Sequence, residues 1–157
     1  MFFPLGLRLH GRHGDQWDYD ATPANSTTFA STGGDGVHFG LLHATTTVPG
    51  AAPVVMTVPM QFDAPNHVLG ASLREFLALG CRTGYYHLER LAYGWGRQEE
   101  TNHLERGHWA GVGWDGEPEE PTVLALLAAV TQEFNLAPWP NVAQRLAELQ
   151  TRYLPAV

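Results

Sequence analysis

The fold of this chain is decided by the segment Phe29-Ala30-Ser31-Thr32-Gly33-Gly34-Asp35-Gly36-Val37-His38-Phe39-Gly40-Leu41-Leu42. Three glycines and an aspartate separate two apolar runs, and the second run has the composition of a β-strand. Glycine adopts backbone angles that are strained for other residues, so the glycines predict a structural turn or β-bulge. We therefore expect a short strand that ends near Ala30, then a turn, and then a strand over residues 37–42.

Two titratable side chains, Asp35 and His38, lie beside this turn. Residues three apart on a strand point to opposite faces, so the two side chains meet only if the turn redirects Asp35. The strand would direct Val37, Phe39 and Leu41 to the core and His38 to the other face. The candidate binding residues of the chain are Gly33, Gly34, Asp35 and His38.

The next apolar run predicts a second strand. Val54-Val55-Met56-Thr57-Val58 is rich in valine and lies between Pro53 and Pro59. With the strand over 37–42 it predicts a hairpin whose loop is of moderate length. Met60-Gln61-Phe62 is expected to continue this strand past a bend at Pro59, and residues 5–10 alternate like a further short strand.

Residues 71–80 carry the strongest helix signal. Ser72 followed three residues later by Glu75 forms a capping box, and Leu73, Phe76 and Leu77 share one face. Gly80 stands where a left-handed C-cap residue is expected.

Three more helices are predicted in the second half of the chain. The first covers residues 83–93, with Tyr86, Leu88 and Leu91 as its apolar positions, and the second begins at Thr122 as N-cap and ends at Phe134. The third follows Pro140, and its apolar stripe has helical spacing at Val142, Leu146, Leu149 and Tyr153.

Because strands come first and helices follow, the order indicates an α+β fold rather than a parallel α/β fold. We expect a small antiparallel sheet from the N-terminal half, packed against helices from the C-terminal half. The length of 157 residues suits one domain over residues 1–157.

The chain is acidic, with 16 Asp and Glu against 9 basic residues and a formal net charge of −7. All nine basic residues are scattered arginines, which argues against nucleic acid or an anionic membrane as the ligand. An acidic surface could instead contact a basic protein partner. The single cysteine, Cys81, excludes an internal disulfide and is expected to be buried. No targeting segment is visible, which predicts a cytoplasmic protein.

Eight histidines raise the question of a metal site. The candidate pairs are His10 with His13 and His103 with His108, and neither spacing places both imidazoles on one face of a regular element. Paired carboxylates occur only in sequence typical of solvated loops, at Asp18/Asp20 and at Glu117/Glu119/Glu120. We therefore predict no catalytic residue, no metal and no cofactor. The tryptophans at 95, 109 and 114 are expected to fill the core, and the role of residues 95–120 is left unassigned.

A family resemblance covers about residues 29–79. The glycine-rich entry into a strand at residues 32–39, the strand Val54–Val58 and the helix Ser72-Leu73-Arg74-Glu75-Phe76-Leu77 resemble the SUKH superfamily. The resemblance implies an α+β binding protein without enzymatic activity, often an immunity protein that neutralises a toxin by direct contact. Gly33, Gly34 and Asp35 match the family's turn, where their role is structural.

Three functional hypotheses follow. The first is a protein-binding domain of the immunity-like type, without enzymatic activity. The second is a small enzyme or metal-binding protein with a site near the Gly33–His38 turn. The third is an assembly role through self-association. The sequence indicates neither the partner nor the oligomeric state.

Overall fold

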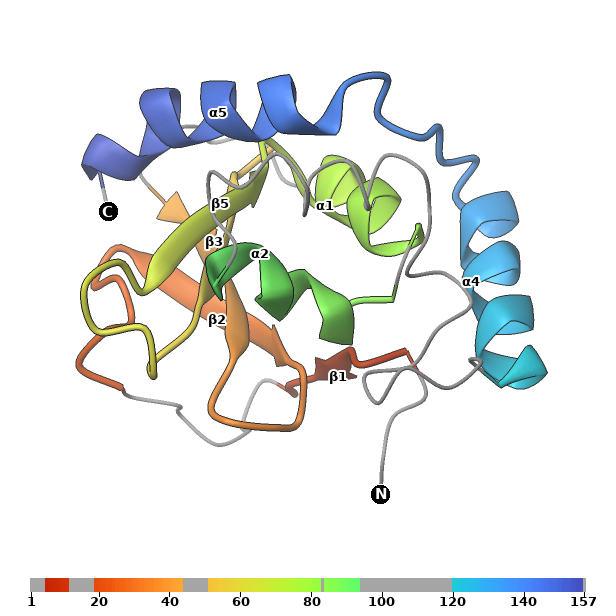
Figure 1. The fold of residues 1–157 in the computed structure, drawn as a ribbon, viewed down its shortest axis with the longest axis horizontal. Coiled ribbons are helices and arrows are strands. Elements are labelled where there is room, and N and C mark those ends of the chain that lie inside the picture. Colours follow the sequence, from red (N-terminus) through yellow and green to blue (C-terminus); the bar gives the residue numbers. More distant parts are fainter. Residues whose placement is uncertain (1–4, 12–18, 44–50, 83, 94–119, 157) are drawn as a thin grey trace.

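Five strands form one antiparallel sheet in the order β1-β2-β3-β4-β5 (Figure 1). The structure is a computed structural model and describes residues 5–11, 19–43, 51–82, 84–93 and 120–156. The strands are β1 (Arg8–Leu9), β2 (Ser26–Ser31), β3 (His38–Leu42), β4 (Val54–Thr57) and β5 (Asn66–Gly70). The predicted hairpin is confirmed, because β3 pairs with β4 in an antiparallel register that matches Phe39 with Met56.

The described helices come after the sheet in the sequence, and this order confirms the α+β fold. They are α1 (Leu73–Gly80), the 3₁₀-helix η2 (Tyr86–Leu88), α2 (Glu89–Tyr93), α4 (Pro121–Glu133), α5 (Val142–Tyr153) and the 3₁₀-helix η3 (Leu154–Ala156). In Figure 1, α5 runs along the top of the sheet beside β5, whereas α4 lies at the outer right side, away from the strands.

The core is built around the aromatic ring of Phe76 on α1, which is fully buried. Its ring centroid lies 5.9 Å from that of Phe29, 4.9 Å from that of Phe39 and 5.3 Å from that of Tyr85. These rings come from β2, from β3 and from the segment before η2. One side chain therefore joins the sheet to two helical segments.

The chain between β4 and β5 differs from the prediction. Met60-Gln61-Phe62 does not continue β4 but forms part of a turn, in which the Gln61 amide donates to the Val58 carbonyl at 3.0 Å. Proline has no amide hydrogen, so Pro59 cannot continue the ladder of a strand. The chain reverses instead, and residues 66–70 form β5, which the sequence had not predicted.

The beginning of α1 agrees with the predicted capping box, but its end does not. Ser72 Oγ accepts from the Glu75 amide at 3.2 Å, and the Glu75 carboxylate accepts from the Ala71 amide at 2.6 Å. Gly80, however, is the last helical residue, and Cys81 caps the helix in a right-handed conformation. Glycine is required at position 80 for space, because an added Cβ would lie 2.1 Å from the ring of Tyr85.

Two further helix predictions need correction. The helix predicted over 83–93 is divided into η2 and α2, and Tyr85 rather than Tyr86 is fully buried; Thr83 lies outside the described residues. Helix α4 has Glu120 as its N-cap and Pro121 as its first residue, not Thr122 as the cap. Proline suits this position because its missing amide hydrogen has no intrahelical acceptor there.

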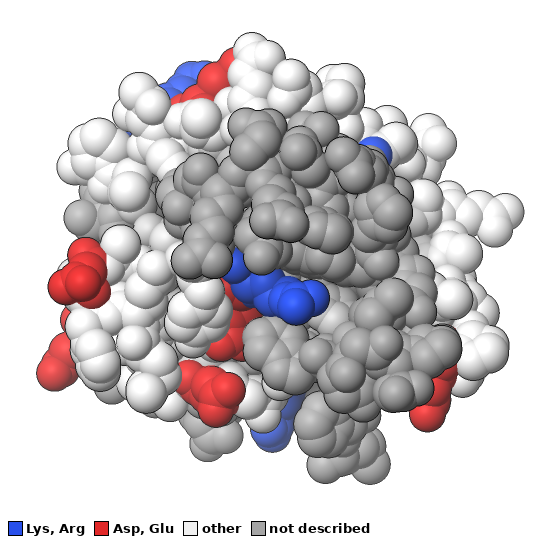
Figure 2. All heavy atoms as spheres, viewed as in Figure 1, with Lys and Arg blue, Asp and Glu red and all other residues white. Residues whose placement is uncertain are grey.

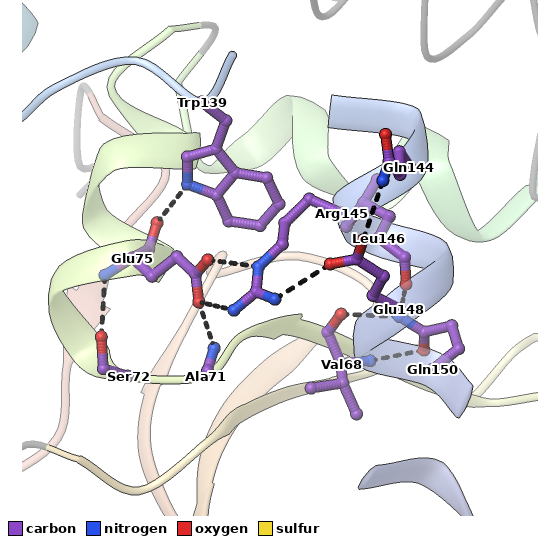
Figure 3. A network of polar contacts seen from close by, with 10 residues as sticks. All are labelled: Val68, Ala71, Ser72, Glu75, Trp139, Gln144, Arg145, Leu146, Glu148 and Gln150. Carbon is purple, nitrogen blue, oxygen red and sulfur yellow. Dashed lines mark hydrogen bonds and ion pairs between the residues drawn. The ribbon is translucent and has the colours of Figure 1, made fainter. Parts of the chain in front are cut away.

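Helix α5 matches the predicted stripe and is tied to α1 by polar contacts (Figure 3). Arg145 donates from Nε to Glu75 Oε1 at 2.6 Å and from a second nitrogen to Glu75 Oε2 at 3.3 Å. The indole nitrogen of Trp139 donates to the Glu75 carbonyl at 3.1 Å. Glu75 therefore caps α1 and also orients α5.

The same helix covers the outer edge of the sheet. The Gln150 side chain accepts from the Val68 amide at 2.8 Å and donates to the Val68 carbonyl at 2.7 Å (Figure 3). Val68 belongs to β5, whose outer edge has no strand neighbour among the described residues. The glutamine amide thus replaces the missing strand partner at one residue.

Candidate functional site

The predicted turn has the strained backbone that its glycines suggested. The φ angles are +87° at Gly33, +49° at Asp35 and +72° at Gly36, all in the left-handed region. The Val37 amide donates to the Gly34 carbonyl at 3.1 Å and closes the turn. Position 36 requires glycine for a second reason, because an added Cβ would lie 2.6 Å from the ring of Tyr19.

His38 is buried on the side of β3 opposite the Phe39 side chain. Its Nδ1 donates to the Gly36 carbonyl at 2.7 Å, so the neutral ring presents Nε2 as an acceptor to the Thr22 hydroxyl at 3.0 Å. The ring stacks on Tyr19 with centroids 5.8 Å apart and planes 16° apart. Burial lowers the pKa of His38, which keeps the imidazole neutral at pH 7.

The turn leaves Asp35 exposed, whereas His38 is buried. The charge of Asp35 helps to raise the pKa values of Glu89 and Tyr93. Gly33 is exposed and Gly34 is half-buried. Of the four predicted residues, His38 is the one whose side chain is held by hydrogen bonds and a ring contact to described residues.

A row of polar side chains crosses the sheet at the level of His38, and sequence reasoning missed it. The strand registers place Ser31, His38, Thr57 and Asn66 opposite one another on four neighbouring strands. Thr57 donates to Asn66 Oδ1 at 2.8 Å, and Asn66 donates to the Ala21 carbonyl at 3.0 Å. The row therefore fastens the segment containing Ala21 over one face of the sheet.

A second buried histidine, His67, was also missed. Its Nε2 donates to Gln61 Oε1 at 2.8 Å, and Gln61 Nε2 donates to the Ala92 carbonyl at 2.6 Å. This chain of contacts joins the loop between β4 and β5 to helix α2. Burial lowers the pKa of His67 to about 4, and a backbone hydrogen bond to Ala64 opposes part of this shift. No local motif identifies this residue, because its partners are brought by the fold.

Glu89 is a further buried titratable group, with 4% of its surface exposed. Burial raises the pKa of its carboxyl group, while the hydroxyl of Tyr93, which donates to Glu89 Oε1 at 3.1 Å, acts in the opposite direction. Cys81, expected to be buried, is half-buried, and its Sγ lies 3.6 Å from the Tyr85 hydroxyl.

No three His, Cys, Asp or Glu side chains within the described ranges stand close enough together to hold a metal ion. Several predicted features lie outside these ranges: His13, the pair His103 and His108, Asp18, Glu117 and Glu119, and the three tryptophans. Within the ranges that the structure describes, no helix combines the length and apolar composition that crossing a membrane requires.

Comparisons with protein-family models, curated proteins and solved structures found no match to this chain. The resemblance to the SUKH superfamily therefore rests on the quoted residues alone and stays a prediction.

The lowered pKa values of the buried His38 and His67 predict that stability falls in mild acid. The unfolded chain protonates His67 near pH 6.5, whereas the folded chain does so only near pH 4, so stability rises with pH between these values. His38 shifts in the same direction. For His67 alone we expect a loss of about 2 kcal/mol between pH 7.5 and pH 5, measured by urea unfolding at several pH values.

The matched variants are His67→Asn, which should flatten this slope, and His43→Asn at the exposed end of β3, which should retain it. If stability depended on pH equally steeply in the parent and in His67→Asn, His67 would not be the source of the pH dependence, even if the variant were less stable at every pH.

Proposed function

We propose that this chain is a protein-binding domain, and that it binds its partner through Met60, Phe62 and Tyr93, here named the loop-tip surface. The observation that carries the proposal is the exposure of Phe62, of which 83% is accessible on an ordered loop. Met60 and Tyr93 are 60% and 50% exposed. Exposed aromatic and methionine side chains are typical anchors of protein interfaces.

The backbone beneath these side chains is held by hydrogen bonds at several points. The Val58 amide donates to the Pro65 carbonyl at 2.8 Å, and the Ala64 amide donates to the Gln61 carbonyl at 3.3 Å. Gln61 itself lies between Met60 and Phe62 and is bound to His67 and to Ala92. A loop that is ordered before binding loses less conformational entropy in a complex, which supports its use as a recognition element.

The charge around the loop-tip surface favours a basic partner. Asp63 is exposed next to Phe62, and Asp35 lies close enough to Tyr93 and Glu89 to influence their pKa values. Acidic side chains gather at the left edge of the view in Figure 2, where Figure 1 places the yellow loop between β4 and β5. We infer a protein with an apolar pocket for Phe62 and arginine or lysine side chains around it.

The resemblance to the SUKH superfamily supports the same reading, since it implies binding by direct contact without catalysis. A cytoplasmic location and an immunity-like role are parts of this proposal. The internal hydrogen bonds of His38 and His67 agree with it, because they engage these imidazoles in holding the fold.

The proposal is tested by site-specific photo-crosslinking in native lysate, with benzoylphenylalanine at position 62 and, as the control, at the exposed apolar position 9 of β1. We expect a crosslinked protein at position 62 alone. With that protein purified, Phe62→Ala should weaken binding about 30-fold, the loss of an interface hot spot, and added salt should weaken it further. The proposal fails if position 62 yields no crosslink, or if Phe62→Ala binds as tightly as the parent.

A further inference from the structure

The side chain of Gln61 joins the loop between β4 and β5 to helix α2. Gln61 lies between Met60 and Phe62 in the sequence, and its Nε2 donates to the Ala92 carbonyl at 2.6 Å. Ala92 directly precedes Tyr93, the third member of the loop-tip surface. One half-buried side chain therefore connects the two segments of backbone that carry this surface.

We propose that Gln61 is a positioning residue, which holds Phe62 and Tyr93 in the relative arrangement that the partner recognises. The inference rests on the proposed function. It assigns part of the affinity to a side chain whose polar atoms are already bound within the chain, since Oε1 accepts from His67 and Nε2 donates to Ala92. Gln61 thus acts on binding indirectly, through the placement of its neighbours.

His67 determines which way the Gln61 amide faces. His67 is 3% exposed, and its Nε2 donates to Gln61 Oε1 at 2.8 Å. The reversed amide would place its oxygen 2.6 Å from the Ala92 carbonyl oxygen, and two acceptors repel each other at that distance. Both contacts therefore select the same orientation of the amide, and each supports the other.

The backbone hydrogen bonds of the loop, in contrast, are local. The Gln61 amide donates to the Val58 carbonyl at 3.0 Å, and the Ala64 amide donates to the Gln61 carbonyl at 3.3 Å. These bonds shape the turn but do not join it to α2. Among the described residues, the Gln61 side chain makes the only hydrogen bond from residues 59–64 to that helix. Without it, we expect Phe62 to lose its fixed position relative to Tyr93.

The first test uses the full chain without a partner. Gln61→Leu removes both side-chain hydrogen bonds, and we expect the order parameter of the Phe62 amide, measured by NMR relaxation, to fall from about 0.85 to about 0.6. Gln150→Leu is the matched control, because it removes another glutamine that is bound to backbone, at Val68 of β5. This control should leave the Phe62 amide as ordered as in the parent.

Gln61→Glu separates the two hydrogen bonds of the side chain and is also the second variant if Gln61→Leu fails to fold. Its carboxylate can still accept from His67 but cannot donate to the Ala92 carbonyl. Because the contact with α2 is the one that positions the loop, we expect Gln61→Glu to lower the order parameter of the Phe62 amide as Gln61→Leu does. Thermal unfolding identifies a variant that does not fold.

The second test measures binding of the protein captured at position 62. We expect Gln61→Leu to weaken binding about tenfold, because the loop must then be ordered in the complex. In the Phe62→Ala background the same substitution should weaken binding by less than about twofold, since the side chain to be positioned is absent. A merely structural loss would weaken binding equally in both backgrounds.

The proposal is overturned if the Phe62 amide is as ordered in the folded Gln61 variants as in the parent. It is also overturned if Gln61→Leu weakens binding equally with and without the Phe62 side chain. If position 62 captures no protein, the proposed function fails, and the order parameters still decide whether Gln61 positions the loop.

Discussion

Replacing Phe76 with alanine should destabilise the protein by about 3–5 kcal/mol, the largest effect we expect from a single substitution. The side chain is fully buried, and its ring contacts those of Phe29, Phe39 and Tyr85. Its removal leaves a cavity between β2, β3 and the segment before η2, and the surrounding structure relaxes into such a cavity only partially. Urea unfolding followed by circular dichroism measures the loss.

Phe62→Ala is the matched control, because it removes the same side chain from a position that is 83% exposed. We expect its stability to lie within about 0.5 kcal/mol of the parent. If Phe76→Ala lowered the free energy of unfolding no more than Phe62→Ala does, the central position of Phe76 in the core would be refuted.

Replacing Gly80 with alanine should destabilise the protein by about 3 kcal/mol, the upper part of the range for overpacked cores. The new Cβ would lie 2.1 Å from the Tyr85 ring. That ring cannot move away easily, since it is 1% exposed and its hydroxyl donates to the Leu77 carbonyl at 3.1 Å.

Gly80→Asn separates this explanation from the C-cap role that the sequence suggested. Asparagine is tolerated in a left-handed cap, so if position 80 were such a cap, Gly80→Asn would cost the protein little stability. Asparagine is also larger than alanine, so if position 80 is crowded, Gly80→Asn will destabilise the protein more than Gly80→Ala. Gly11→Ala is the control, because no atom lies within 4 Å of its added Cβ. A Gly80→Asn variant as stable as Gly11→Ala in thermal unfolding would restore the cap interpretation.

The elements that the sequence predicted correctly are those whose signals are local. The capping residues of α1 are three positions apart, and the stripe of α5 repeats within one helix, so neither depends on distant contacts. The hairpin of β3 and β4 follows from two apolar runs that are neighbours in sequence. The left-handed angles at Gly33 and Gly36 were predictable because few other residues adopt them readily.

The elements that were missed depend on contacts between distant residues. Residues 66–70 lack a strong strand pattern and become β5 by pairing with β4 on one side and accepting Gln150 of α5 on the other. Gly80 resembles a cap in sequence, and only the position of Tyr85 shows that it provides space. A pattern of residue types cannot contain this information, because it does not specify which side chains meet.

The same division holds for the candidate site. The sequence by itself determined the α+β class, the strained turn and the unusual placement of His38 beside it, because composition and backbone preference act over a few residues. Only the tertiary structure decided that Asp35 is exposed while His38 is buried, and that Ser31, His38, Thr57 and Asn66 form one row. It also decided that Phe62 remains exposed. Strand register and burial set these outcomes, and both are properties of the whole packed chain.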